Sequence, residues 1–254
     1  RKDYSLLPAQ YNINNFQWSV LSKKAADKSF FIDCAGCHST GVDSKKMKFI
    51  EPGVGCEACH GPGSNHLIAP LGKKMATTIN PRHLPYNVAA MICGSCHSQG
   101  KNPQGKYAYP DGYRAGEQIA NKFHFVDKNN ADYFWPTHNA KEPPLEYLDW
   151  LQSKHSEAGI GCIDCHSAHD KDNSNHYQTR LAGDKLCLSC HPQKHVNELH
   201  NSGSCISCHM PESIGALNPG KIKSHTFKPI NPVTGKNLGS LYQQPKNCFS
   251  CHRQ

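Results

Sequence analysis

The sequence has few of the features from which an ordinary globular core or a membrane segment is built. Only 37% of its 254 residues are hydrophobic, and the mean hydropathy is −0.65. The longest apolar stretch, near Val88–Cys93, is far shorter than the roughly 20 residues that cross a bilayer. The chain also opens on the polar Arg1-Lys2-Asp3 and shows no secretory signal. We therefore expect no membrane span, and a mature or trimmed chain.

Cysteine, in contrast, is abundant, and every cysteine falls in one repeated unit. The 14 cysteines form seven Cys-x-x-Cys-His motifs. The cysteines are Cys34, Cys37, Cys56, Cys59, Cys93, Cys96, Cys162, Cys165, Cys187, Cys190, Cys205, Cys208, Cys248 and Cys251. The histidines that end the motifs are His38, His60, His97, His166, His191, His209 and His252. Two thiols at this spacing can add to the two vinyl groups of a haem, and the adjacent histidine can ligate its iron. The repeat therefore predicts seven covalently attached haems c.

Three other uses of cysteine fit this repeat less well. A structural zinc site needs four ligands and would not require a histidine after every second cysteine. Disulfide bonds would suit an extracytoplasmic protein but would leave the histidines unexplained. A thioredoxin-like redox motif would occur once, on a βαβ pattern. With all 14 thiols assigned to haem, none remains for a disulfide or an N-terminal lipid anchor, and we expect a soluble chain.

The formal net charge of +8 is explained better by haem than by nucleic acid. Two propionates on each of seven haems lower the total charge to about +1 with ferric iron and about −6 with ferrous iron. The chain has no Arg- or Lys-rich run of the kind that binds nucleic acid. We therefore expect no nucleic-acid partner.

The second axial ligand of each iron decides whether a substrate can bind there. Ten histidines lie outside the motifs. They are His66, His83, His124, His138, His155, His169, His176, His195, His200 and His225. Of the four methionines, Met210 directly follows His209 and is expected to pack rather than to bind iron. Ten histidines suffice for seven irons, so every haem can be ligated by two histidines.

Spacing along the chain favours particular histidines. His66 lies six residues beyond its motif, across a Gly-Pro-Gly-Ser-Asn turn, and His169 lies three residues beyond the fourth motif. His155 ends a predicted helical stretch that begins at 143 and is closed by Gly159, because two prolines, an acidic first turn and a terminal glycine are typical helix signals. One side of that helix is predicted to pack on a porphyrin face through Leu145, Leu148, Leu151 and Trp150.

Longer stretches around the motifs resemble a large family of multihaem c-type cytochromes. They include Gly-Val-Gly-Cys-Glu-Ala-Cys-His-Gly-Pro-Gly-Ser at 53–64 and Tyr-Pro-Asp-Gly-Tyr-Arg-Ala-Gly-Glu at 109–117, with shorter matches at 153–155, 159–162, 186–191, 208–211 and 224–227. The family is related to the tetrahaem electron acceptor of hydroxylamine oxidoreductase and includes multihaem domains fused to tetratricopeptide repeats. Its members are secreted or periplasmic electron carriers, and some relatives are enzymes. Many have a further haem motif upstream of the point where this chain begins.

The resemblance implies which histidines are the second ligands. The family usually has ligands at the positions of His66, His155, His169 and His225. His138 and the pair His195 and His200 correspond less closely, and they bring the implied set to seven. His83, His124 and His176 are left over.

The predicted fold is mainly α with much irregular loop and very little β, cored by haems that run in a continuous chain. Many prolines in the first half of the sequence keep its helices short. We expect a three-haem region at 1–110, a connector with a packing helix at 111–161 and a four-haem region at 162–254, all in one haem-packed unit. The connector is too aromatic for a free tether.

The predicted function is electron transfer in the periplasm or outside the cell. The expected partners are redox proteins: other cytochromes, quinol-oxidising complexes or outer-membrane complexes. Polymerisation into a conductive filament is a special form of this hypothesis.

Two other classes of function stay open. One is an oxidoreductase for a small nitrogen or sulfur compound, which needs one haem with an open face beside acid–base groups. All seven motifs end in histidine, so the Lys-for-His replacement typical of pentahaem nitrite reductases is absent. The other is a haem-bearing docking module, for which the loop at 215–244 is a candidate surface.

Overall fold

The computed structural model describes residues 4, 6–12, 16–20, 27–141, 143–169, 177–192, 204–213 and 222–229. The chain divides into two units, Arg1–Val126 and Asp127–Gln254. Their boundary falls inside the predicted connector, which thus contributes to both units.

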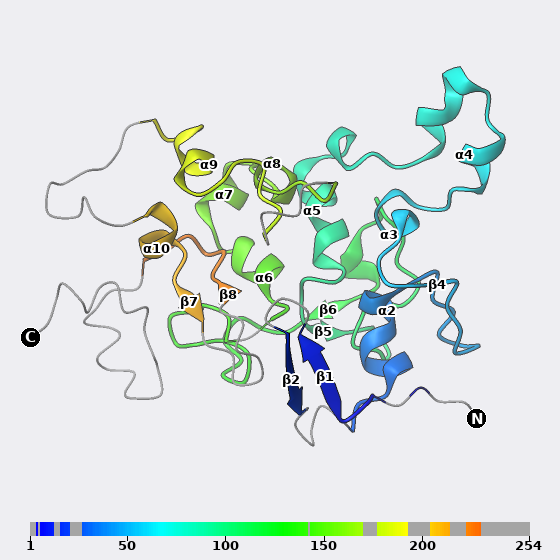
Figure 1. The fold of residues 1–254 in the computed structure, drawn as a ribbon, viewed down its shortest axis with the longest axis horizontal. Helices are drawn as coiled ribbons and strands as arrows, with labels where there is room; N and C mark the ends of the chain where they lie inside the picture. Colours follow the sequence, from blue (N-terminus) through cyan, green and yellow to red (C-terminus); the bar gives the residue numbers. More distant parts are fainter. Residues whose placement is uncertain are drawn as a thin grey trace, which may run out of the picture. The chain divides into compact units, whose positions relative to one another are not determined.

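Short helices separated by loops make up most of the regular structure (Figure 1). The α-helices are α2 (Ala35–His38), α3 (Cys56–His60), α4 (Ser64–Ile68), α5 (Tyr86–Gly94), α6 (Glu146–Trp150), α7 (Lys154–Glu157), α8 (Cys162–Cys165), α9 (Asp184–Leu188) and α10 (Cys205–His209). A π-helical turn, η1 (Phe30–Cys34), precedes α2, and the 3-10 helices are η2 (Leu71–Thr77), η3 (Pro81–His83) and η4 (Ile119–Asn121). The longest described helix, α5, has nine residues and starts directly after Pro85, as expected of a proline-interrupted chain.

The strands form four separate antiparallel pairs. They are β1 (Ala9–Asn12) with β2 (Gln17–Val20), β3 (Ser39–Thr40) with β4 (Glu51–Pro52), β5 (Gly100–Lys101) with β6 (His124–Phe125), and β7 (Glu212–Ser213) with β8 (Ile222–Lys223). In the first pair Tyr11 lies opposite Trp18, and their rings are 5.1 Å apart. The predicted class, mainly α and loop with very little β, is confirmed.

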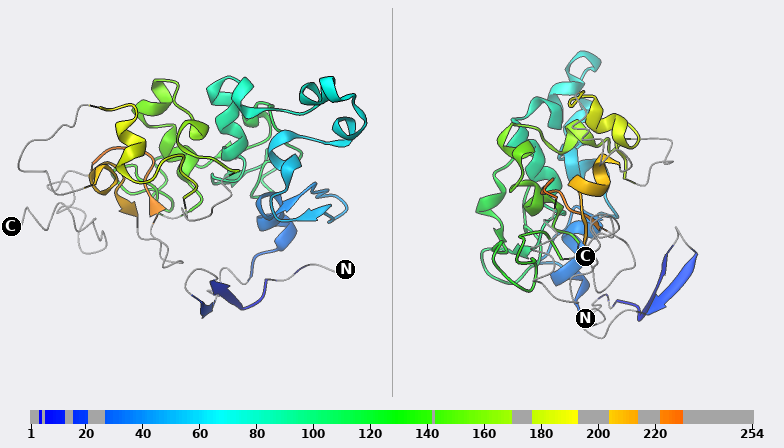
Figure 2. Two further views of the ribbon diagram at one scale, coloured as in Figure 1. Left: turned by 45° about the horizontal axis from the view of Figure 1, so that its top comes forward. Right: turned by 90° about the vertical axis from the view of Figure 1, so that its left-hand side faces the viewer.

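Aromatic side chains gather around the buried Phe31 in the N-terminal unit. The rings of Tyr4, Phe30, Phe31 and Phe49 lie within 5.5–6.2 Å of one another. Apolar residues of α5 are also buried, together with Tyr107, Tyr109, Ile119 and Phe123. The β1–β2 hairpin and the α4–η2 segment project from this core (Figure 2).

The C-terminal unit is built around α6. Leu145, Leu148 and Trp150 are buried, whereas Leu151 is 44% exposed. The packing of this side on a porphyrin face stays a prediction. The predicted single helical stretch is two helices, because the side chain of Ser153 accepts a hydrogen bond from Ser156 N (3.1 Å) and starts α7 there.

Within the described residues, no helix is both long and apolar enough to cross a membrane.

Candidate haem-binding sites

Six of the seven motifs lie in the described residues, and each is carried by a helical turn (Figure 1). In motifs three, four and five the histidine N–H donates to the carbonyl of the first cysteine at 2.9 Å. This i to i+4 bonding places both thiols and the imidazole on one side of the turn. The twelve described cysteines form no disulfides. The seventh motif, Cys248, Cys251 and His252, lies outside the described residues.

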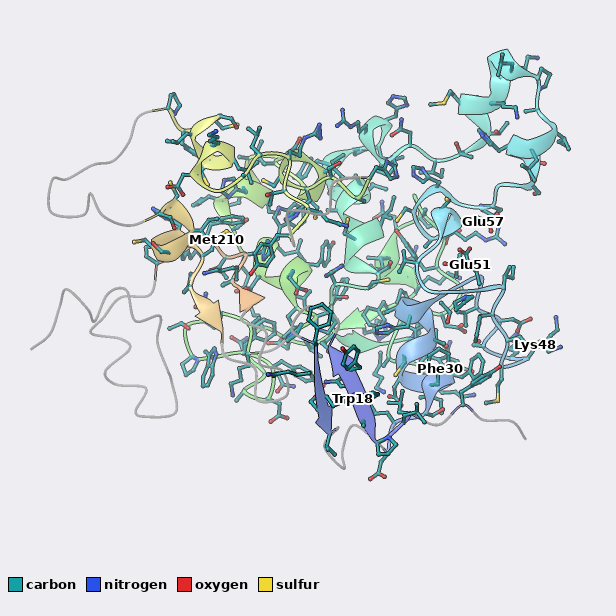
Figure 3. All side chains as sticks on the ribbon, viewed as in Figure 1. Trp18, Phe30, Lys48, Glu51, Glu57 and Met210 are labelled. Atoms are coloured by element: carbon teal, nitrogen blue, oxygen red, sulfur yellow. The ribbon has the colours of Figure 1, made fainter. Side chains whose placement is uncertain are left out.

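Thr40 shapes the turn that leads into the second motif. Its hydroxyl donates to Gly53 O and accepts from Gly55 N, both at 2.8 Å, and its side chain is buried. Gly53 has a φ of +82°, a conformation that favours glycine. Glu57, which lies within the motif and is labelled in Figure 3, accepts from Gly63 N at 2.7 Å. The positive φ explains the glycine at position 53, three residues before Cys56.

The first motif is held against a buried tyrosine. Tyr109 is 2% exposed, and its hydroxyl donates to Phe31 O at 2.6 Å. A Cβ on Gly36, between the two cysteines of the motif, would lie 2.2 Å from the tyrosine ring. Only glycine fits between the two cysteines at this position.

Motifs one and three lie side by side, although motif two comes between them in the sequence. Cys37 Sγ is 3.9 Å from Ser95 O and 4.0 Å from Cys96 O, and Cys96 Sγ is 4.0 Å from Gly36 O. In the chain before haem attachment, the hydrogen bond between the two thiols lowers the pKa of Cys96 to about 6 and raises that of Cys37. Haems attached here would be neighbours.

Motifs four, five and six also lie close together. The thiols of Cys187 and Cys205 share a hydrogen bond, and Cys205 N donates to Asp184 Oδ1 at 2.9 Å. Burial raises the pKa of Cys165, and the nearby thiols of the fifth motif raise it further. The fifth motif therefore lies close to both of its neighbours in the sequence, the fourth and the sixth.

Main-chain carbonyls orient two of the motif histidines. His60 Nδ1 lies 2.6 Å from Ile79 O, and His166 Nδ1 lies 2.8 Å from Tyr177 O. A carbonyl can only accept, so each Nδ1 carries the proton and the lone pair is on Nε2. This is the tautomer in which Nε2 can bind a metal.

Two histidine pairs of the C-terminal unit have the spacing expected across an iron. The ring centres of His166 and His225 are 6.1 Å apart, as are those of His155 and His191. A metal–imidazole bond is about 2 Å long, so rings on opposite sides of one iron have centres about 6 Å apart. Each pair joins a motif histidine to a predicted second ligand.

The second ligands of these pairs differ in their surroundings. His225 Nδ1 lies 2.9 Å from Lys223 O, which fixes its tautomer as in His166. His155 Nδ1 is buried and has no hydrogen-bond partner among the residues that the structure describes. Burial, followed by the nearby His191, lowers the pKa of His155, so its ring is neutral near pH 7. A neutral, buried imidazole nitrogen without a partner fits a metal ligand, and the donor set fits haem.

His66 is oriented by the segment that follows it. The residue lies on α4, and its Nδ1 is 3.1 Å from Lys74 O and 3.3 Å from Thr77 Oγ1. Thr77 donates to the same carbonyl at 2.6 Å. His66 therefore presents Nε2 away from η2.

The remaining predicted ligands are less closely organised. His138 is exposed, with its Nδ1 3.3 Å from Lys128 O and a φ of +62°. His169 is exposed on the turn after α8. His195, His200 and the left-over His176 lie outside the described residues. Met210 lies beside His209 at the end of α10 (Figure 3). Among the described residues, no three His, Cys, Asp or Glu side chains gather as a metal site of their own.

The sequence analysis missed Thr40, Tyr109 as a clamp on the first motif, and Asp149. Asp149 is 1% exposed and accepts hydrogen bonds from Ala140 N (3.0 Å), Ser224 Oγ (2.6 Å) and His225 N (3.1 Å). The short helix α6 also contains the acidic Glu146, so no sequence signal identified Asp149 as the buried carboxylate.

Two family models match parts of the chain. The model described as cytochrome c554 and c-prime matches residues 9–61, and the doubled CXXCH motif matches residues 155–196. These stretches contain motifs one, two, four and five.

Two similar proteins are cytochromes by name. The cytochrome c nitrite reductase subunit NrfA of Nitratidesulfovibrio vulgaris is 26% identical over 187 residues, which cover 59% of this chain and 34% of that protein. The chain thus spans about a third of the length of this relative. The crystal structure of the outer cell wall cytochrome OcwA matches with a TM-score of 0.74 and 24% identity, over 98% of this chain and 66% of that one. This likeness shows a shared fold.

Proposed function

We propose that this multihaem cytochrome c carries electrons along seven covalently attached haems, most of them ligated by two histidines. The observation that carries the proposal is the 6.1 Å spacing of two imidazole pairs, His166 with His225 and His155 with His191. Bound haem supplies a one-electron iron couple. The protein's own task at such a site is to keep both imidazoles in place while the charge of the iron changes.

The proposed roles follow the motifs. The cysteines of all seven motifs attach the haems, and the motif histidines are the first axial ligands. We assign His225 to the haem of the fourth motif and His155 to that of the fifth. The other second ligands are His66, His138, His169, His195 and His200.

Contacts between motifs support close haem neighbours. The thiols of Cys37 and Cys96 link motifs one and three, and those of Cys187 and Cys205 link motifs five and six. In the N-terminal unit, electrons would therefore pass between haems one and three directly.

The proposal also includes three regions, 1–110, 111–161 and 162–254, in one haem-packed unit. It further includes kinship with the tetrahaem acceptor of hydroxylamine oxidoreductase.

The proposed location is periplasmic or extracellular, where redox proteins would be the donor and acceptor. The name of the similar outer cell wall cytochrome agrees with this location. End-to-end assembly into a conductive filament is the polymeric form of the same function. Electron microscopy at high concentration tests it, and discrete particles alone would contradict assembly.

Spectroscopy of the ferric holoprotein tests the closed irons. We expect low-spin signals, no carbon monoxide binding after reduction, and about seven haems per chain by haemochrome absorbance. His155→Ala should open one iron and create one carbon monoxide site. If that variant binds no carbon monoxide, the assignment of His155 is wrong.

A second candidate function is reduction of a small nitrogen compound, favoured by the similarity to a nitrite reductase subunit. It requires one iron with an open face in the wild-type protein. A high-spin signal in the ferric wild type, together with turnover of nitrite, would favour this candidate over electron transfer.

A further inference from the structure

Asp149 is an acidic residue in the buried part of the C-terminal unit, where a charge is energetically unfavourable. It lies in α6 and is 1% exposed, between the buried Leu148 and Trp150. A carboxylate removed from water must be satisfied by hydrogen bonds or by an opposite charge. The ion pairs formed within the described residues do not include Asp149.

Three donors satisfy this carboxylate, and two of them come from one distant loop. Asp149 Oδ2 accepts from Ser224 Oγ at 2.6 Å and from His225 N at 3.1 Å. Asp149 Oδ1 accepts from Ala140 N at 3.0 Å. The loop that carries His225 is therefore attached to α6 by charge-assisted bonds, which are the stronger kind.

A second buried side chain completes the attachment. Asn139 Nδ2 donates to Ser224 Oγ at 2.9 Å and to Thr226 Oγ1 at 3.0 Å. Asn139, Ser224 and Thr226 are each no more than 3% exposed. The residues on both sides of His225 are thus fixed in the core, while the His225 ring lies 6.1 Å from that of His166.

We infer that Asp149 is the positioning residue for His225 as second axial ligand of the haem of the fourth motif. The inference rests on the proposed function, because it requires His225 to bind iron. The carboxylate itself does not contact the iron; it acts through the main chain of His225 and the hydroxyl of Ser224. A fixed loop keeps the imidazole at the iron in both oxidation states.

Asp149→Asn is the informative change because the side-chain volume is kept. Both carboxylate oxygens accept from a main-chain N–H, so an amide in either orientation turns its NH2 group toward one of these donors. The loop should loosen, and His225 should leave the iron in part of the molecules.

The experiment compares holoprotein variants by carbon monoxide binding to the reduced form and by the low-spin signal of the ferric form. We expect about one carbon monoxide per chain in His225→Ala, a measurable fraction of one in Asp149→Asn, and none in the wild type. Added imidazole should restore the low-spin signal in both variants, which a merely misfolded protein would not show. Asp132→Asn, the same change at an exposed site of this unit, should match the wild type.

The outcomes separate the inference from the function on which it rests. If His225→Ala binds no carbon monoxide, His225 is not a ligand, and the assignment and the inference both fail. If His225→Ala opens the iron but Asp149→Asn keeps the wild-type low-spin signal, only the positioning role is overturned. Should Asp149→Asn fail to accumulate, Ser224→Ala removes one donor and leaves the carboxylate. A partial loss of the low-spin signal there supports the inference, and a wild-type signal overturns it.

Discussion

Replacing Gly36 by alanine should destabilise the first haem-attachment turn strongly. The new methyl carbon would lie 2.2 Å from two carbons of the Tyr109 ring and 2.7 Å from its Cβ. The ring cannot easily move away, because Tyr109 is 2% exposed and its hydroxyl is bonded to Phe31 O at 2.6 Å. Overpacking of this kind costs about 1–3 kcal/mol, and loss of the hydroxyl bond adds about 1 kcal/mol.

A total near 3 kcal/mol corresponds to a fall in melting temperature of about 6–12 °C for a chain of this size. Thermal unfolding of the holoprotein, followed by far-ultraviolet circular dichroism, measures it. Gly72→Ala is the matched control, because a Cβ at Gly72 would meet nothing within 4 Å. If Gly36→Ala melts within about 2 °C of this control, the packing argument for the first motif is refuted.

Three smaller changes test other contacts. Thr40→Val removes both bonds of the hydroxyl, to Gly53 O and from Gly55 N, and should lower the free energy of unfolding by about 2–3 kcal/mol, whereas Thr40→Ser should restore it. Ser153→Ala removes the N-terminal cap of α7 and should cost about 1 kcal/mol in urea unfolding; no change would mean that the cap contributes nothing. Burial raises the pKa of Asp149 from 3.8 to about 6, so the folded state binds this proton more tightly than the unfolded state does. Its contribution to stability should therefore fall by about 3 kcal/mol as the pH rises from about 4 to about 7, and Asp149→Asn should remove that slope from the pH profile of unfolding.

The attachment chemistry could be predicted from the sequence because it is local. Two cysteines and a histidine at i, i+3 and i+4 define a helical turn with all three side chains on one side. The structure has such turns in all six motifs that it describes. Short helices were predictable for a similar reason, since proline acts on its own neighbours. The break before α7 was missed because a serine cap and a serine within a helix look alike in sequence.

Contacts between distant segments could not be predicted in this way. The spacing of the motifs suggests an order along the chain, yet motif three contacts motif one through Cys96 and Cys37. Similarly, Asp149 reads as one of two acidic residues in a short helix, and only the loop around Ser224 makes it a buried acceptor. Gly36 is one of 20 glycines, and its role depends on a tyrosine more than seventy residues away.

The orientation of the histidine rings could not be predicted from the sequence either, because the partners of Nδ1 are main-chain carbonyls. Five of the described histidines lie with Nδ1 near such a carbonyl: His60 at Ile79, His66 at Lys74, His138 at Lys128, His166 at Tyr177 and His225 at Lys223. These contacts are made by the main chain of the acceptor residues, which are lysine, isoleucine and tyrosine, so the side chains in the sequence do not identify them. A carbonyl also carries no net charge, so it fixes the tautomer without the burial cost of a carboxylate. Residue counting can therefore identify enough imidazoles for seven irons, whereas the backbone decides which nitrogen each imidazole presents. Asp149 also helps to orient a histidine, but it accepts a hydrogen bond from the main-chain N–H of His225 and does not bind the imidazole ring.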